Sequence, residues 1–230
     1  MKKIGLIGGL SWVSTAEYYR RINEIAQEAL GGAASARLIL ESVNRQEYSD
    51  AESANDNEAA CQILLDAAKS IERGGAAFIA MTFNGGHRFV PEIQPHISIP
   101  FLHIAQASAD AIKSAGIKSV GLLGVRNTME GSFYPEILKQ HGIATIIPNE
   151  EEKTFIHETI INELVENDFR KSTRDRYISI IRALRSRGAH GVILGCTEIP
   201  LLLSEGDVDV KTFSTTELHC KAAVKLAIEE

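Results

Sequence analysis

A cysteine at the end of a strand-like run is the residue of this chain best suited to chemistry. Cys196 follows the apolar run HGVIL at residues 190–194, which is short enough to be a buried parallel strand. The sequence PLLL at residues 200–203 is typical of the start of a helix. In open α/β sheets ligands bind at this end of a strand, where backbone N–H groups and the helix dipole favour an anion. The same field is expected to lower the pKa of the thiol, so Cys196 is a candidate base or nucleophile beside a carboxylate site.

A lone cysteine is equally typical of a small buried apolar side chain. The chain contains three cysteines, Cys61, Cys196 and Cys220, which are widely spaced and form no C-x-x-C or His/Cys metal pattern. The sequence therefore predicts reduced thiols, no metal site and a cytoplasmic protein. Cys61 and Cys220 lie on helix-like segments and are expected to be structural.

Composition restricts the class of protein. The 230 residues are 44% apolar with a net charge of −6, which allows a sizeable core and argues against disorder. No basic stripe is present, so nucleic acid is not an expected partner. No apolar run approaches membrane-spanning length, and the first residues lack the features of a signal peptide.

The chain contains an internal repeat. Residues 4–8 (IGLIG) and 120–124 (VGLLG) both read as strands that end in glycine, and they match at a shift of 116 residues. The helix-like segments 64–71 and 177–184 each lead through glycine into a short apolar strand and match at a shift of 113. A shift of 114 would set Ile71 against Arg185, so 113 is preferred. This register sets Phe83 against Cys196.

The repeat predicts an α/β fold of two similar, pseudo-symmetric halves, each with a small parallel sheet. The boundaries are expected at 1–98 plus 214–230 for the first half and 99–213 for the second, with the last helix covering the first half. The active site is expected in the cleft between the halves, and residues 149–153 (NEEEK) are expected to form a solvated loop. Strands are expected near 4–8, 36–42, 77–82 and 99–102, and again near 119–124, 144–147, 191–195 and 210–213.

Five motifs in order resemble those of the aspartate/glutamate racemase family, the cofactor-independent amino-acid racemases. They cover nearly the whole chain: GGLSW at 8–12 followed by ST at 14–15, YYR at 18–20, FLHIA at 101–105, TME at 128–130, and GCTEI at 195–199. The resemblance implies that two facing sheets hold an amino acid. Two side chains, usually both cysteines, then exchange its α-proton from opposite faces, and backbone N–H groups hold the α-carboxylate. It implies no cofactor, a small amino-acid or dicarboxylate substrate and a homodimer.

The chemistry explains why such residues are needed. An amino-acid α-proton is very weakly acidic, so without an electron-sink cofactor the carbanion must be stabilised by fixed dipoles. A base must reach the proton on one face, and inversion needs a proton source on the other. The glycines at 8–9 do not match the dinucleotide-binding motif G-x-G-x-x-G. A glycine turn whose backbone N–H groups face a carboxylate explains the same residues.

The chain departs from the family at the first catalytic position. The family motif reads Cys or Thr, then Asn-Thr-x-His, whereas residues 82–87 read TFNGGH. Asn84 and His87 keep the spacing, so the catalytic position falls on Phe83, which has no proton to give, and the following threonine is replaced by Gly85. A slip of one residue would place Thr82 there instead.

The site expected from these considerations has Cys196 as acid or base on one face and Thr82, or water, on the other. Residues expected near the substrate are Leu10, Ser11, Phe83, Asn84, Gly85, Thr197 and Glu198, of which Glu198 either tunes the thiol or caps a helix. His87 and His103 are expected to be orienting groups. The predicted activity is racemisation of aspartate- or glutamate-like substrates, slow or one-sided. Two alternatives stay open: a single-cysteine decarboxylase or isomerase of a malonate-like acid, and a catalytically disabled amino-acid-binding protein.

Overall fold

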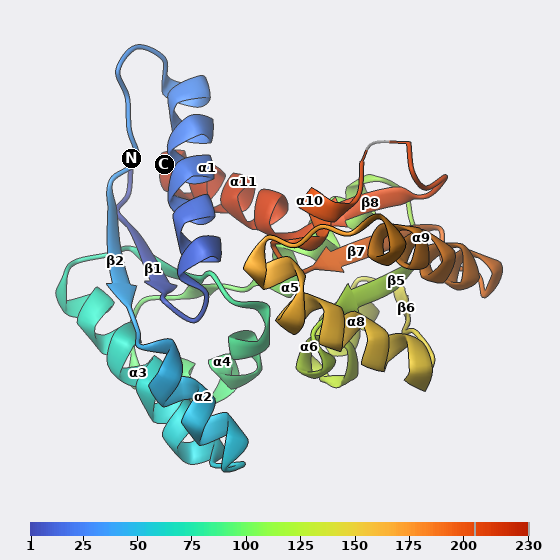
Figure 1. Cartoon of the computed structure of the whole chain (residues 1–230). Helices are drawn as coiled ribbons and strands as arrows, with labels where there is room; N and C mark the ends of the chain where they lie inside the picture. The colour runs from blue at the N-terminus through green and yellow to red at the C-terminus, as the bar shows by residue number, and fades with distance from the viewer. Residues whose placement is uncertain (205, 230) are drawn as a thin grey trace. The chain divides into compact units, whose positions relative to one another are not determined.

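The chain forms two compact units in the computed structural model, which describes residues 1–204 and 206–229 (Figure 1). The first unit comprises Met1–Ile104 and the C-terminal residues from His219, and the second is Ala105–Leu218. The chain therefore passes from one unit to the other inside two helices, α5 (Ile104–Ser114) and α11 (Thr215–Ile228). The boundaries expected from the sequence, 98/99 and 213/214, lie a few residues earlier, and residue 230 lies outside the described residues.

The first unit contains a parallel sheet of four strands in the order β2-β1-β3-β4. The strands are β1 (Ile4–Gly8), β2 (Leu38–Ser42), β3 (Phe78–Met81) and β4 (Phe101–Leu102). Each falls where the sequence predicts a strand, because short β-branched and aliphatic runs bounded by glycine and polar residues favour buried parallel strands.

Alternate residues of these strands bury against helices on opposite faces of the sheet. Ile4 and Leu6 pack with α1 (Trp12–Leu30) and α11, whereas Ile7 and Ile79 belong to the cluster under the helices of the other face. That other face is covered by α2 (Arg45–Ser53), α3 (Asn57–Arg73) and α4 (Val90–Ile93), after the 3₁₀ segment η1 (Asn84–Phe89). The last helix therefore completes the core of the first unit, as the sequence predicts.

The second unit repeats this plan with the strand order β6-β5-β7-β8, again all parallel. Its strands are β5 (Ser119–Gly124), β6 (Ala144–Ile146), β7 (Gly191–Gly195) and β8 (Lys211–Ser214). Its other helices are α6 (Arg126–Glu130), α7 (Phe133–Gln140), α8 (Glu150–Asn162), α9 (Lys171–Ser186) and α10 (Ile199–Leu202). Ile156 of α8 and Tyr177 of α9 are buried against Leu123 and Val192 of the sheet.

The expected loop at residues 149–153 is wrong, because α8 begins there. Asn149 is its N-cap, and its side chain accepts a hydrogen bond from the backbone of Glu152, whose carboxylate bonds back to the Asn149 backbone. Such a capping box satisfies two backbone donors, and acidic residues in the first turn suit the positive end of the helix dipole. The charged run is therefore a helix start.

The sheet registers fix which residues of the two halves correspond. Ile4 pairs with Phe78 in the first sheet, and Val120 pairs with Gly191 in the second. When Ile4 is set on Val120, a shift of 116, Phe78 falls on Gly191, a shift of 113. The backbone pairing therefore reproduces both shifts found in the sequence and makes Phe83 the positional equivalent of Cys196.

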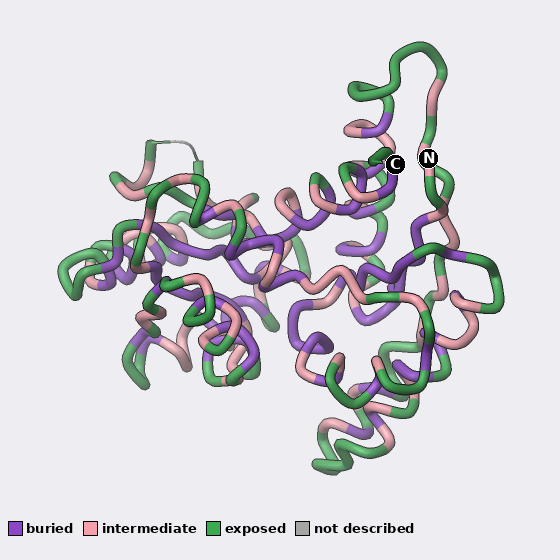
Figure 2. The backbone as a smooth tube through the Cα atoms, turned by 180° about the vertical axis from the view of Figure 1, so that it is seen from behind, coloured by how far each residue is buried: buried purple, intermediate pink, exposed green. Residues whose placement is uncertain are grey.

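In both sheets the strand order reverses beside the central strand, between β1 and β3 and between β5 and β7. Loops that leave these two strands diverge to opposite faces, so ligands bind at their carboxyl ends. The turns after β1, β3, β5 and β7 carry every residue expected at the site. Figure 2 shows the central strands β1, β3, β5 and β7 as almost entirely buried and much of the connection from α1 to β2 as exposed. In the described part of the chain, no helix combines the length and apolar character needed to cross a bilayer.

Candidate active site

The carboxyl end of β7 places a thiol against a carboxylate. The Cys196 Sγ donates a hydrogen bond to Oε2 of Glu198 at 2.8 Å, and Glu198 is only 4% exposed. Glu198 is also the N-cap residue of α10, although its side chain does not cap that helix. Of the two roles expected for Glu198, the geometry therefore favours the one directed at the thiol.

The expected lowering of the thiol pKa is wrong. Burial raises the pKa of Cys196 well above its ordinary value of 9.0, and the negative charge of Glu198 raises it further. Backbone N–H groups of Glu198 and Thr197 act in the opposite direction but are outweighed. Since α10 has only four residues, the field of a helix N-terminus is weak here. The thiol is therefore protonated at neutral pH, with its proton directed at a carboxylate.

Two glycines let the strands approach each other beside this pair. A Cβ on Gly195 would lie 2.5 Å from the Leu123 carbonyl oxygen, and one on Gly124 would lie 3.0 Å from the Gly195 carbonyl oxygen. The Thr128 side chain packs against both glycines, and its buried hydroxyl has no hydrogen-bond partner among the described residues. Sequence reasoning used Thr128 only as part of a motif and did not assign it to the site.

In the first unit, the turn after β1 is tied to the end of β3. Ser11 caps α1 by accepting a hydrogen bond from the Ser14 backbone at 3.3 Å, and the preceding Leu10 is buried in the core. The Thr15 hydroxyl donates to the Ser11 carbonyl and accepts from the Gly9 backbone. It also lies 3.2 Å from the Thr82 hydroxyl. Because Thr15 has already given its one proton, Thr82 donates in that bond.

Phe83 occupies the position equivalent to Cys196. It is partly buried against the core cluster of the first unit, and its ring meets that of Tyr48 edge to face, with centroids 5.9 Å apart. Asn84 and Gly85 follow as the first, buried residues of η1. The first unit therefore presents an aromatic ring at its strand end where the second unit presents a thiol.

Three imidazoles form a cluster in the first unit, with tilted and edge-to-face ring contacts. The ring centroid of His87 lies 4.7 Å from that of His103 and 5.5 Å from that of His219. His87 donates from Nε2 to the Met81 carbonyl, which ties η1 to β3. His219 donates to the Leu102 carbonyl at 2.8 Å and accepts from the Tyr18 hydroxyl at 3.0 Å.

Burial keeps these imidazoles neutral. It lowers the pKa of His103 and of His219 to about 4, and it lowers that of His87 well below 6.5 with help from its two neighbours. His87 therefore holds the end of β3 and contacts the His103 ring, and the orienting role of both residues in the site stays a prediction. His219 is a member that sequence reasoning missed, because no local pattern shows that the last helix returns to the first sheet.

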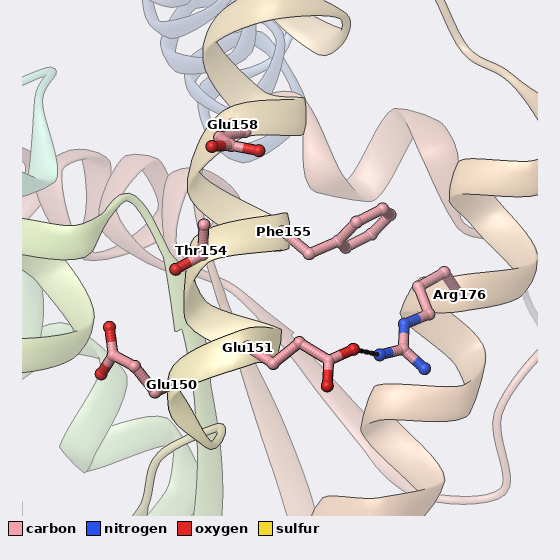
Figure 3. Close-up of a pocket in the computed structure, with 6 residues that line it drawn as sticks. All are labelled: Glu150, Glu151, Thr154, Phe155, Glu158 and Arg176. Carbon is pink, nitrogen blue, oxygen red and sulfur yellow. Dashed lines mark hydrogen bonds and ion pairs between the residues drawn. The ribbon is translucent and has the colours of Figure 1, made fainter.

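Two surface hollows of the second unit are not lined by Cys196. One, of about 380 Å³, lies between α8 and α9, and Figure 3 shows its Glu151 carboxylate directed at the Arg176 guanidinium, 2.7 Å away. The other, of about 440 Å³, lies beside the ends of β7 and β8. Neither is lined by any of the expected site residues.

In each unit, the expected site residues lie in the turns that follow the central strands of the sheet. Cys196, Thr197 and Glu198 lie together after β7. Leu10, Ser11, Thr82, Phe83, Asn84 and Gly85 lie at the ends of the neighbouring strands β1 and β3.

Comparison with known proteins gives a consistent family. The chain is 40% identical to a protein from Yersinia pestis assigned as an Asp/Glu racemase, with all of both chains covered and a TM-score of 0.94. It is 36% identical to an aspartate racemase homologue from Pyrococcus horikoshii, with complete coverage of both and a TM-score of 0.88. It is 22% identical over 224 residues, 96% of each chain, to the broad specificity amino-acid racemase RacX of Bacillus subtilis. The family model for Asp/Glu/hydantoin racemases matches residues 7–223. The chain therefore belongs to the Asp/Glu/hydantoin racemase family.

Proposed function

We propose that this member of an amino-acid racemase family moves the α-proton of aspartate- or glutamate-like amino acids with Cys196, without pyridoxal phosphate or metal. The observation that carries the proposal is the contact between the partly buried Cys196 thiol and the buried Glu198 carboxylate, which are 2.8 Å apart. A group whose pKa is strongly shifted by burial and by a specific charged partner, as that of Cys196 is, is a candidate for a functional site.

The pair supplies both states that proton transfer needs. As an acid, the Cys196 thiol gives its proton to a carbanion. As a base, it first passes that proton to Glu198, and the resulting thiolate removes the α-proton from the substrate. The negative charge that develops on the substrate needs N–H donors at its carboxylate. Asn84, Gly85 and Thr197, with Leu10 and Ser11, are the proposed substrate-binding residues.

The first unit is the proposed reason for slow or one-sided activity. Phe83 carries no transferable proton, so the second face of the α-carbon must be served by Thr82 or by water. Thr82 directly precedes Phe83 and carries a hydroxyl. Its hydroxyl is 3.2 Å from that of Thr15, so any proton that it gives must come out of this hydrogen bond.

A second candidate function is favoured by the same equivalence of Phe83 and Cys196. A decarboxylase of a malonate-like acid forms its carbanion by losing carbon dioxide and needs one proton donor only. Cys196 would supply that proton, and Phe83 would contact an apolar substituent. A catalytically disabled amino-acid-binding protein is the outcome if neither reaction occurs.

The cellular context belongs to the same proposal. The three cysteines, all among the described residues, form no disulfide bond, and we propose a reducing, cytoplasmic compartment. We propose a homodimer, which analytical ultracentrifugation tests directly.

The test is solvent deuterium entry at the α-carbon, measured by mass spectrometry across a panel of L- and D-amino acids. We expect deuterium to enter aspartate or glutamate more readily from one enantiomer than from the other. Rapid and equal interconversion of both enantiomers overturns the one-sided mechanism. Proton delivery to a substituted malonate without any amino-acid exchange favours the decarboxylase instead.

A further inference from the structure

We infer that Phe83 and Gly85 are a coupled pair: the ring of Phe83 fills the space that a side chain at residue 85 needs, and together they close the proton-transfer position of the first unit. The inference rests on the proposed function for its catalytic part, and on steric geometry alone for the coupling.

The steric conflict is direct. A Cβ placed on Gly85 would lie 2.9 Å from Cζ and 3.1 Å from Cε1 of the Phe83 ring, closer than ordinary van der Waals contact. The three nearest atoms to that Cβ all belong to Phe83. The ring therefore lies over Gly85 and takes the place of a side chain there.

Backbone conformation does not require glycine at this position. Gly85 is not among the residues with a positive φ, so an L-amino acid fits its backbone. Gly86 is different, because its Cβ would lie 2.3 Å from Sδ of the buried Met81. Residue 85 is thus limited to glycine by the ring of Phe83, whereas residue 86 is also limited by the core.

The ring is held where it is by its other contacts. Phe83 packs against the buried cluster that includes Met81, and Tyr48, which is 2% exposed, meets it edge to face. Moving the ring aside therefore costs packing on that side. A residue with a hydroxyl or thiol at position 83 alone leaves a void over Gly85. A side chain at position 85 alone overlaps the Phe83 ring. Both substitutions are therefore needed to open the proton-transfer position of the first unit.

The coupling is tested by denaturant unfolding of Gly85→Ala in two backgrounds. In the native chain we expect Gly85→Ala to lower the folding equilibrium constant, on the order of tenfold, because of overpacking. In Phe83→Thr we expect the same change to raise that constant about twofold or more, since alanine restricts the unfolded chain and fills the void. Gly86→Ala is the control and should destabilise both. A Gly85→Ala change that stabilises both backgrounds overturns the coupling.

The catalytic part is tested by deuterium entry and enantiomer conversion in Phe83→Thr, Gly85→Thr and the double variant. We expect conversion in the double variant to exceed that of Phe83→Thr at least about tenfold, within the range of one acid–base group. A double variant that unfolds as cooperatively as the native chain and converts no faster than Phe83→Thr overturns the closed-position assignment. Failure of the proposed function gives a different result: the Cys196→Ala variant would then take up deuterium at the same rate as the native chain.

Discussion

The thiol of Cys196 points its proton at the carboxylate of Glu198, two residues along the chain, across 2.8 Å. The pair is local in sequence, so the β7–α10 turn alone fixes its geometry. Glu198 is buried, whereas Cys196 is only partly buried. The resting state of the site is therefore a protonated thiol beside a carboxylate that accepts its hydrogen bond.

Removing the charge of Glu198 should lower the pKa of Cys196. Burial and the Glu198 charge both raise this pKa in the native chain, so Glu198→Gln removes one of the two causes while keeping an oxygen acceptor. We expect the pH profile of Cys196 alkylation by iodoacetamide, followed by mass spectrometry, to shift to lower pH. An unchanged profile would show that burial alone controls the thiol.

Replacing the thiol should abolish proton transfer. We expect Cys196→Ala to reduce deuterium entry by roughly 10²- to 10⁴-fold, the range of a general acid or base. The matched control is Cys61→Ala, which changes a thiol that packs against the first-unit core and should leave exchange as in the native chain. Equal rates in the native chain and Cys196→Ala would remove Cys196 from the mechanism.

The hydroxyl of Thr82 can be tested by shape-matched substitution. Thr82→Val deletes the donor to Thr15 and should destabilise the fold by about 1 kcal/mol, the value of a typical hydrogen bond. If Thr82 serves the second face, enantiomer conversion falls in Thr82→Val while deuterium entry through Cys196 persists, and Thr82→Ser retains conversion. We expect this result. If Thr82→Val converts enantiomers as fast as the native chain, water and not Thr82 supplies the second proton.

The three clustered imidazoles should make the stability of the first unit fall at acidic pH. The folded-state pKa values of His103 and His219 are about 4, against 6.5 for free imidazole, so the unfolded chain binds more protons between these limits. Stability is therefore complete above about pH 6.5 and falls as the pH drops toward 4, by roughly 3 kcal/mol per imidazole at the lower limit.

Denaturant unfolding at pH 7 and pH 5 measures this loss. His219→Gln, which can still donate to the Leu102 carbonyl, should show a weaker pH dependence than the native chain. The exposed His96 is the control, and His96→Asn should follow the native chain. A pH dependence that is equal in all three proteins would contradict the assignment.

Much of the fold is predictable from the sequence because its signals are local. Short runs of strand-forming residues, bounded by glycine, proline or polar residues, predict the eight strands of the described chain, and the two shifts of the repeat agree with the register of β3 and β7. The misses arise where a distant group decides the outcome. The pKa of Cys196 depends on burial by the whole second unit, and His219 reaches its partners only because α11 returns to the first sheet.

The start of α8 was missed for a different reason. A run of acids after asparagine has no apolar periodicity, so the segment resembles a solvated loop until the reciprocal bonds of Asn149 and Glu152 are seen. The internal repeat predicts that Phe83 is the counterpart of Cys196, but only the structure shows that the Phe83 ring lies over Gly85.

The path of the last helix sets an order of folding. The second unit is one continuous segment, whereas the core of the first unit includes Cys220, Val224 and Ala227 from the far end of the chain. During synthesis, the second unit can bury its core before residues 219–228 leave the ribosome, but the first cannot. The N-terminal half, made first, is therefore completed last, and its exposed sheet face must wait for the C-terminal helix to arrive.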